Sequence, residues 1–513
     1  MKTMKHTEHI LRGIVSVILA GSVFTASAAT NGNFDDDDIA DALELELLLD
    51  DKLSFNNIDV RVIDGIATLE GEARHLLAKE RAARIAEMVK GVRSVVNLVK
   101  VRPLTPVTAA QLQNDVESAL YSDPATESYE IEVAADSGGN VTLAGEVESW
   151  QEKNLAAKVA KSVRGVTGVD NDITVDYEED RPDIEIKEDV ESRLAWSTLI
   201  DDGLIDVAVE NGEVKLSGTV GSATEKRRAR YAAWGITGVT AVDESGLEVE
   251  RWARDKDLRK DKYVMKSDEE IRKAVMDALL WDPRVYSFKI EPDVRNGKVT
   301  LRGTVDNLKA KRAAERVARH TVGVNRVVNF IKIRSKEWPS DDEIRSSILD
   351  QLALDPVVES FEINVAVNNR IVTLRGGVDT MAEKLQAEDV ASGVKGVVHV
   401  QNFLTTTGGG LLETDDYLDY DPYDWDYTWS YYPHYEPAIP SEVATDAGIK
   451  EDIEDQLFWS PFVDSDDVNV SVEDGVATLT GQVETRKERV AAHENALEGG
   501  ARKVNNLLTI GGE

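Results

Sequence analysis

The sequence predicts an α+β protein made of six copies of one small module, each with the element order α-β-β-α-β and a three-stranded sheet packed on two helices. Three observations carry this prediction. A phrase close to V-T-L-x-G recurs, and its glycines are Gly71, Gly145, Gly218, Gly303, Gly376 and Gly481. An asparagine follows 25 or 26 residues later in five copies, and Glu244 holds that place in the third. A trio of apolar residues precedes each phrase. Similarity at a regular spacing is typical of tandem modules.

The first element of each module is expected to be a helix, because its apolar residues recur at i, i+4 and i+8 and therefore share one face. Ser267 and Ser340, each followed by acidic residues, are suitable N-caps. The six trios are Ile39/Leu43/Leu47, Leu112/Val116/Leu120, Ile186/Val190/Leu194, Ile271/Val275/Leu279, Ile344/Ile348/Leu352 and Ile449/Ile453/Leu457.

A hairpin and a second helix are expected next. Alternation of apolar residues, as in Ile205-Val207-Val209, predicts a half-buried strand. Asn211-Gly212 then provides a tight turn, and the V-T-L-x-G strand returns antiparallel. An amphipathic helix of about 16 residues follows, as at 308–320, and a glycine such as Gly323 ends it before the last strand.

Composition excludes several classes of function. The chain has 513 residues, a formal net charge of -36 and no cysteine. Nucleic-acid binding needs a concentrated positive footprint, so we expect no nucleic-acid partner. The absence of cysteine excludes disulfides, thiol nucleophiles, zinc-thiolate sites and iron–sulfur clusters.

The N-terminus has the features of a secretory signal peptide. Lys2, Lys5 and Arg12 precede an apolar run, and Ala26-Ser27-Ala28 matches a small-residue cleavage site. We expect residues 1–28 to be removed and the mature chain to begin at Ala29 or Thr30. Export of a cysteine-free acidic protein favours the bacterial periplasm.

The remaining chain divides into modules and two long linkers. The expected modules 1 to 6 span residues 35–104, 108–178, 183–250, 267–335, 340–406 and 444–511. Linker 251–266 carries seven basic and three acidic residues, and linker 407–440 is acidic and crowded with Tyr and Trp. The second linker is either a tether or a segment that docks a protein or glycan. Short linkers with prolines, such as Arg102-Pro103 to Pro106, favour a linear array with neighbour-to-neighbour contacts.

No catalytic, metal or cofactor motif is present. The sequence contains no P-loop, no G-x-G-x-x-G after a strand and no G-x-S-x-G elbow, and its histidines have no metal-ligand spacing. The repeated glycines are interpreted as structural turns, because anion cradles are found at helix N-termini. We therefore expect neither enzymatic activity nor a cofactor.

The repeated pattern of a helix, V-x-V-x-[DN]-G-x-V-T-L-x-G-x-V, a helix and G-V-x-x-V-x-N resembles the BON domain, named for bacterial osmotically inducible periplasmic proteins and nodulation-type secreted proteins. The resemblance covers nearly the whole mature chain. Arg370 replaces the usual turn glycine in the fifth copy, which affects a turn only. The resemblance implies a lipid- or envelope-binding module that is often linked to osmotic or envelope stress, and it offers no catalytic residues to carry over.

Nine residues are candidate lipid contacts. Trp196, Trp281 and Trp459 occupy one equivalent position after the first helix, where they act either as interfacial wedges or as core residues. The second helices supply cations that either contact lipid headgroups or form a solvated face, namely Lys226, Arg227, Arg228, Lys309, Lys311 and Arg312. The leading hypothesis is binding to a phospholipid membrane surface, and the alternative is a structural or adaptor array that docks envelope proteins or glycans.

Overall fold

The computed structural model describes residues 35–50, 53, 57–126, 129–177, 181–254, 262, 266–285, 288–334, 338–358, 360, 363–406, 445–459, 463, 465–473, 475–483, 488–489, 492–493, 495–496, 501 and 503–510. The expected signal peptide and linker 407–440 lie outside these residues, as does most of linker 251–266. Residues 36–513 form one compact unit.

Two helices are assigned to each of the first five modules. The first helices of modules 1 to 6 are α1 (Asp36–Leu49), α3 (Ala109–Ser122), α5 (Asp183–Trp196), α7 (Asp268–Leu280), α9 (Asp341–Leu354) and α11 (Asp446–Trp459). The second helices of modules 1 to 5 are α2 (Leu76–Met88), α4 (Trp150–Lys161), α6 (Ala223–Trp234), α8 (Leu308–Arg319) and α10 (Met381–Gly393). Most of the corresponding stretch of module 6 lies outside the described residues.

The strands follow the predicted order. Modules 1 and 2 contain β1 (Asn57–Ile63), β2 (Ile66–Ala73), β3 (Ser94–Asn97), β4 (Lys100–Val101), β5 (Ile131–Ala135), β6 (Asn140–Val147), β7 (Gly168–Asn171) and β8 (Thr174–Val175). Modules 3 and 4 contain β9 (Ile205–Glu210), β10 (Glu213–Val220), β11 (Ala241–Val249), β12 (Ile290–Arg295), β13 (Lys298–Val305), β14 (Arg326–Asn329) and β15 (Lys332–Ile333). Modules 5 and 6 contain β16 (Ile363–Asn368), β17 (Ile371–Val378), β18 (His399–Thr406), β19 (Val468–Glu473), β20 (Val476–Val483), β21 (Lys503–Asn506) and β22 (Thr509–Ile510).

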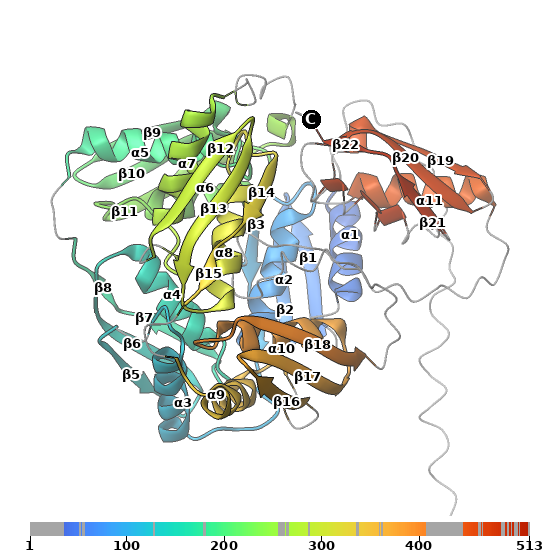
Figure 1. Cartoon of the computed structure of the whole chain (residues 1–513). Helices are drawn as coiled ribbons and strands as arrows, with labels where there is room; N and C mark the ends of the chain where they lie inside the picture. The colour runs from blue at the N-terminus through green and yellow to red at the C-terminus, as the bar shows by residue number, and fades with distance from the viewer. Residues whose placement is uncertain are drawn as a thin grey trace, which may run out of the picture. The chain divides into compact units, whose positions relative to one another are not determined.

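The V-T-L-x-G strand lies at the centre of each sheet. It pairs antiparallel with the strand before it and parallel with the strand after it, as in β1-β2-β3. The helices cover one face of each sheet (Figure 1). The apolar trio of each first helix is buried, with Val275 and Ile348 at 0% exposure. The predicted α+β fold with six repeated modules is thus confirmed.

The asparagine that follows the V-T-L-x-G glycine by 25 or 26 residues connects the last strand to the second helix through hydrogen bonds. Asn97 Nδ2 donates to the carbonyl oxygen of Lys79 at 2.7 Å, and its Oδ1 accepts from the N–H of Val99. The asparagines of modules 2, 4, 5 and 6 also donate to a carbonyl oxygen of the second helix or its equivalent. In module 3, Glu244 pairs with Arg230 of α6 instead. In five modules this asparagine thus satisfies partly buried main-chain groups of the second helix and the last strand.

An aspartate at the start of the first helix holds the hairpin turn. Asp268 accepts hydrogen bonds from the N–H groups of Asn296 and Gly297 at 2.8 and 3.0 Å. In modules 1, 3 and 5 the carboxylates of Asp36, Asp183 and Asp341 accept the same pair of bonds. The bonds stabilise the carboxylate and lower the pKa of Asp268.

The glycine of the V-T-L-x-G phrase lies inside the central strand, whereas glycines such as Gly65 and Gly212 lie in the hairpin turns, with positive φ. Gly71 has φ of 120°, and a Cβ there would lie 2.1 Å from the carbonyl oxygen of Asn57 on the neighbouring strand. The repeat therefore keeps glycine because the two backbones approach closely.

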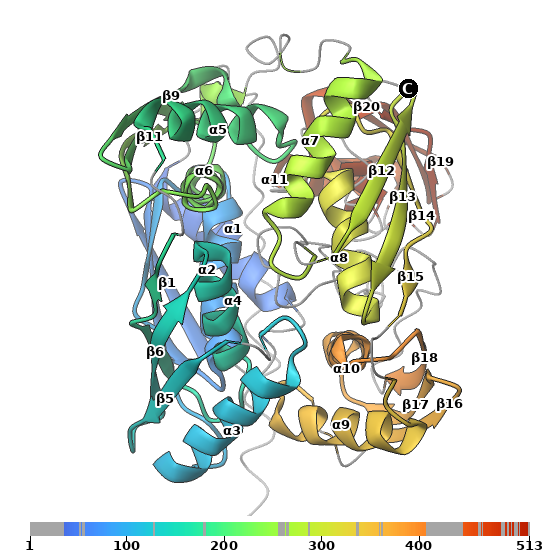
Figure 2. The same cartoon turned by 60° about the vertical axis from the view of Figure 1, so that its left-hand side comes forward.

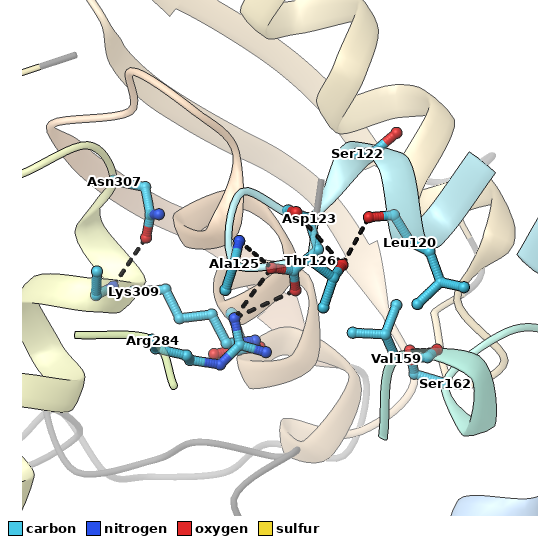
Figure 3. Close-up of polar contacts among 12 residues, drawn as sticks. Leu120, Ser122, Asp123, Ala125, Thr126, Val159, Ser162, Arg284, Asn307 and Lys309 are labelled. Atoms are coloured by element: carbon cyan, nitrogen blue, oxygen red, sulfur yellow. Dashed lines mark hydrogen bonds and ion pairs between the residues drawn. The ribbon is translucent and has the colours of Figure 1, made fainter. Parts of the chain in front are cut away.

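The contacts between modules are not limited to neighbours in the sequence, so the expectation of a linear array is wrong. Helix α2 of module 1 contacts α6 of module 3, and α3 of module 2 lies beside α9 of module 5 (Figure 2). Arg284 of module 4 pairs with Asp123 of module 2 at 3.2 Å (Figure 3). Modules 1 to 5 therefore contact one another through their helices.

Candidate functional site

Trp196 of module 3 and Trp281 of module 4 each pack on the core of the other module. Trp196 ends α5 of module 3 but packs against the core of module 4, and Trp281 follows α7 of module 4 but packs against the core of module 3. Each ring is partly buried and has a cation over it. Arg193 lies 4.6 Å from the centroid of Trp281, and Lys266 lies 5.5 Å from that of Trp196. Both predicted tryptophans thus contact protein at a junction of modules.

Main-chain hydrogen bonds join the same two modules. The N–H of Val322 donates to the carbonyl oxygen of Trp196 at 2.9 Å. The N–H of Thr198 donates to the carbonyl oxygen of His320 at 3.1 Å, beside the bridge between Ser197 and Thr321. These bonds fix the end of α5 against the end of α8.

Three of the predicted helix-2 cations form ion pairs across modules. Arg227 Nε lies 2.6 Å from Glu87 Oε2 of module 1. Lys309 and Arg312 of module 4 pair with Asp389 and Glu388 of module 5 at 2.6 and 2.7 Å. Arg227 and Lys309 are buried.

The other predicted residues lie in varied surroundings. Lys226 Nζ donates to the carbonyl oxygen of Leu247 at 2.6 Å. Arg228 and Lys311 are partly buried on α6 and α8. Trp459 ends α11, and its side chain lies outside what the structure describes. Lipid binding by the nine residues stays a prediction.

The outer face of the module 4 sheet carries a row of cations that sequence reasoning missed. Arg295 of β12 is opposite Lys298 of β13, which in turn is opposite Arg326 of β14. All three are exposed. Like charges on directly opposite residues destabilise a sheet, so this row has a cost that an anion would offset. In module 3 the corresponding row contains Glu210 opposite Glu213.

An apolar ring lies on the same face. Phe330 follows β14 and is 58% exposed, and the guanidinium carbon of Arg302 lies 6.0 Å from its centroid. Lys332 is exposed two residues further on. We call the outer surface formed by Arg295, Lys298, Arg302, Arg326, Phe330 and Lys332 the basic face.

Two carboxylates of β12 lie among the cations of the basic face. Asp293 pairs with Arg295 at 3.4 Å, and Glu291, which is opposite Arg302 in the sheet, pairs with Lys289 at 3.5 Å. Among the described residues, Lys298, Arg302, Arg326 and Lys332 have no carboxylate within ion-pair distance. The basic face could have been predicted from the sequence, because cations at alternate positions of two adjacent predicted strands must share a face of the sheet.

Other kinds of site are missing from the described part of the chain. No group of three or more metal-ligating side chains is present there. Within the same residues, every helix is too short or too polar to cross a membrane.

Comparisons with known proteins identify the repeat. The BON domain model matches residues 35–103, 108–177, 182–251, 267–335, 340–408 and 445–512. Osmotically-inducible protein Y of Escherichia coli (strain K12) is 29% identical over 161 residues, which cover 30% of this chain and 80% of that protein. Outer membrane lipoprotein DolP of Haemophilus influenzae is 26% identical over 171 residues, 31% of this chain and 86% of that protein.

A solved structure also matches. The C-terminal domain of CdsD, a structural protein of the type III secretion system of Chlamydia trachomatis, has 16% sequence identity and a TM-score of 0.12, and the match covers 45% of this chain and 100% of that domain. The family assignment is independent of this match, because the six BON matches span most of the sequence. The chain belongs to the BON domain family.

Proposed function

We propose that this chain is an exported, non-enzymatic binding protein of the bacterial envelope that attaches to anionic phospholipid surfaces through the basic face of module 4. The observation that carries the proposal is the row Arg295–Lys298–Arg326 beside exposed Phe330. The names of the two relatives, one osmotically inducible and one an outer membrane lipoprotein, support a periplasmic location and a link with osmotic or envelope stress.

Charge makes the attachment local and oriented. The whole chain carries -36, so an anionic bilayer repels most of its surface. Each Lys or Arg near such a bilayer contributes about 1 kcal/mol, which falls off within a Debye length. The cations of the basic face supply a local attraction to the bilayer, and the ring of Phe330 is placed to enter the headgroup layer.

The test is co-sedimentation of the mature chain with vesicles. We expect binding to vesicles that contain phosphatidylglycerol, little binding to pure phosphatidylcholine, and weaker binding as salt is raised. Changing Lys298, Arg302 and Arg326 to Gln should abolish binding. The control, which removes two charges, changes Arg61 and Lys100 of module 1 to Gln, because these exposed cations lie on the outer sheet face of a module without the row.

Two results would count against the proposal. One is equal binding by the wild type and the Gln variant of the basic face. The other is tighter binding to duplex DNA than to the anionic vesicles. If the wild type ignores vesicles at low salt, the adaptor function that docks envelope proteins or glycans replaces the lipid function.

The nine residues predicted from the sequence are the second candidate lipid site. Trp196 and Trp281 are partly exposed, but each ring packs on the core of the other module, so full insertion of either ring into a bilayer requires modules 3 and 4 to separate. Changing both to Ala should therefore leave vesicle binding through the basic face intact. Loss of binding with an unchanged melting temperature would favour the tryptophan site.

A further inference from the structure

The sheet of module 5 differs in charge from the rest of this acidic chain. Its strands β16, β17 and β18 contain no Asp or Glu, although the chain as a whole contains 95 of these residues. The sheet of every other module has at least one acidic residue, such as Asp59 in module 1 and Glu132 in module 2. We call the outer surface of β16, β17 and β18 the module 5 face. An anionic partner meets no repulsion from these three strands.

An arginine and a phenylalanine lie side by side on the module 5 face. Arg375 of β17 is opposite Phe403 of β18, and its guanidinium carbon lies 5.4 Å from the centroid of that ring. Both side chains are exposed, Phe403 at 55%. On its other side Arg375 is opposite Asn364, where module 4 has Glu291. Among the described residues, Arg375 has no carboxylate within ion-pair distance.

The basic face of module 4 has the same pair. Arg302 and Phe330 hold the positions equivalent to Arg375 and Phe403, and the guanidinium carbon and the ring centroid are 6.0 Å apart. In modules 1, 2, 3 and 6 the equivalent pairs are Glu70/Leu98, Ala144/Asp172, Ser217/Ser245 and Thr480/Leu507. An exposed ring beside an arginine at these positions is therefore shared by modules 4 and 5.

Modules 4 and 5 are fixed to each other, so their outer faces have a fixed relation. Besides the two ion pairs between α8 and α10, Ile333 of β15 packs against the core of module 5. The N–H of Gly396 donates to the carbonyl oxygen of Asp306 at 3.0 Å. In Figure 2 both sheets lie to the right of α8 and α10, which contact each other. A surface that binds the basic face can thus reach the module 5 face.

We propose that the module 5 face is a second membrane contact, in which Arg375 binds a lipid phosphate and the ring of Phe403 enters the headgroup layer. This inference rests on the proposed attachment through the basic face. A single cation strengthens binding to an anionic bilayer by only about fivefold, so the module 5 face is too weak to attach alone. Attachment through module 4 raises the effective concentration of the second contact. Two contacts then fix the orientation of the chain on the bilayer.

The absence of cysteine allows a dye to be placed at one chosen position. Thr405 of the module 5 face and Thr174 of module 2 are equivalent and exposed, and each hydroxyl donates to a main-chain carbonyl oxygen at 3.1 Å. The variants Thr405→Cys and Thr174→Cys of the mature chain are labelled with a polarity-sensitive dye. Vesicles of equal parts phosphatidylglycerol and phosphatidylcholine are then added. We expect the emission to shift to the blue for the dye at 405 and to stay unchanged for the dye at 174.

A double variant tests the same face by affinity. Gln401→Glu with Phe403→Ser adds a carboxylate to the module 5 face and removes the ring. Module 3 has Asp243 and Ser245 at these two positions, so the fold of a module accommodates both changes. Co-sedimentation with the same vesicles should show binding weakened by about tenfold, because the anionic lipid repels the added charge.

The matched control makes the same two changes in module 6. Asn505→Glu with Leu507→Ser alters the charge and the apolar surface alike, and both positions are exposed. Thr480 stands there in place of the arginine, so we expect binding equal to that of the wild type.

Failure of this inference can be told apart from failure of the proposed function. If the wild type binds vesicles but the dye at 405 shows no blue shift, or the double variant of module 5 binds as well as the wild type, the second contact is refuted and the basic face stands. An equal blue shift at 174, or an equal loss of binding in the control of module 6, also refutes it. If the wild type does not bind at low salt, both proposals fail.

Discussion

The main-chain N–H of Arg164 donates a 2.7 Å hydrogen bond to the carbonyl oxygen of Leu354, three modules later in the chain. Val322 makes the equivalent bond to Trp196 at 2.9 Å. In both pairs the donor precedes the glycine after a second helix, and the acceptor ends a first helix. One type of joint therefore connects module 2 to module 5 and module 4 to module 3.

Arg164→Ala should loosen the joint between modules 2 and 5. Its Nη2 donates to the carbonyl oxygens of Asp355 and Val358 at 2.6 and 2.7 Å. Hydrogen bonds from a charged group contribute about 1.5–3 kcal/mol each, so we expect a fall of at least that order in the free energy of unfolding. Urea denaturation measures it. Lys187→Ala is the control, because Lys187 lies on α5 in an i,i+4 pair with Glu191 whose side chains are 40% and 50% exposed. Equal stability of both variants would contradict the role of this joint.

The fold of each module could be predicted because its signals are local. The periodicity of Ile271, Val275 and Leu279 and the Asn296-Gly297 turn each fix a nearby element. The joints could not be predicted in this way. Whether Arg227 meets solvent or Glu87 depends on which modules pack together, and helical periodicity describes only the face of one helix.

Lys309→Ala should be strongly destabilising. Its pair with Asp389 is buried, with 7% and 5% of the side chains exposed, and removing one partner leaves a buried charge at a cost of about 3–5 kcal/mol. The double variant Lys309→Met, Asp389→Leu should recover most of that loss. Arg102→Ala is the control, because its pair with Glu72 is largely exposed and contributes at most about 1 kcal/mol. Denaturant titration would refute this prediction if the single and control variants lost equal stability.

Trp196→Ala and Trp281→Ala should each lower the melting temperature. Trp196 belongs to module 3 but packs on the core of module 4, and Trp281 belongs to module 4 but packs on the core of module 3. Truncation of either ring therefore leaves a gap beside the core of the other module. Fully buried aromatic truncations cost about 3–5 kcal/mol, and we expect less here because both rings are partly exposed. Tyr121→Ala, at a position 77% exposed, is the control for loss of an aromatic ring. Calorimetry should show a drop for the tryptophan variants only.

His75 should make the protein less stable as the pH falls below about 6.5. The pKa of His75 is lowered to about 4, first by burial and then by the positive charges of Arg164 and Arg74. Its Nδ1 also accepts the N–H of Ala78 at 3.1 Å, which caps α2 and requires that nitrogen to be unprotonated. The imidazole is therefore neutral in the folded state near neutral pH.

The sign of this effect follows from the two protonation equilibria. In the unfolded chain His75 gains a proton near its ordinary pKa of 6.5, whereas in the folded chain it gains that proton only near pH 4. The contribution of neutral His75 to the free energy of unfolding is fully present above pH 6.5. It is lost as the pH falls from 6.5 to about 4, and the loss is at most about 3 kcal/mol. His75→Asn keeps a capping acceptor and should flatten the slope of unfolding free energy in this range. His399→Asn, at an exposed position of β18, is the matched control substitution. Urea denaturation at a series of pH values decides the outcome, and identical slopes for wild type and His75→Asn would refute the role of His75.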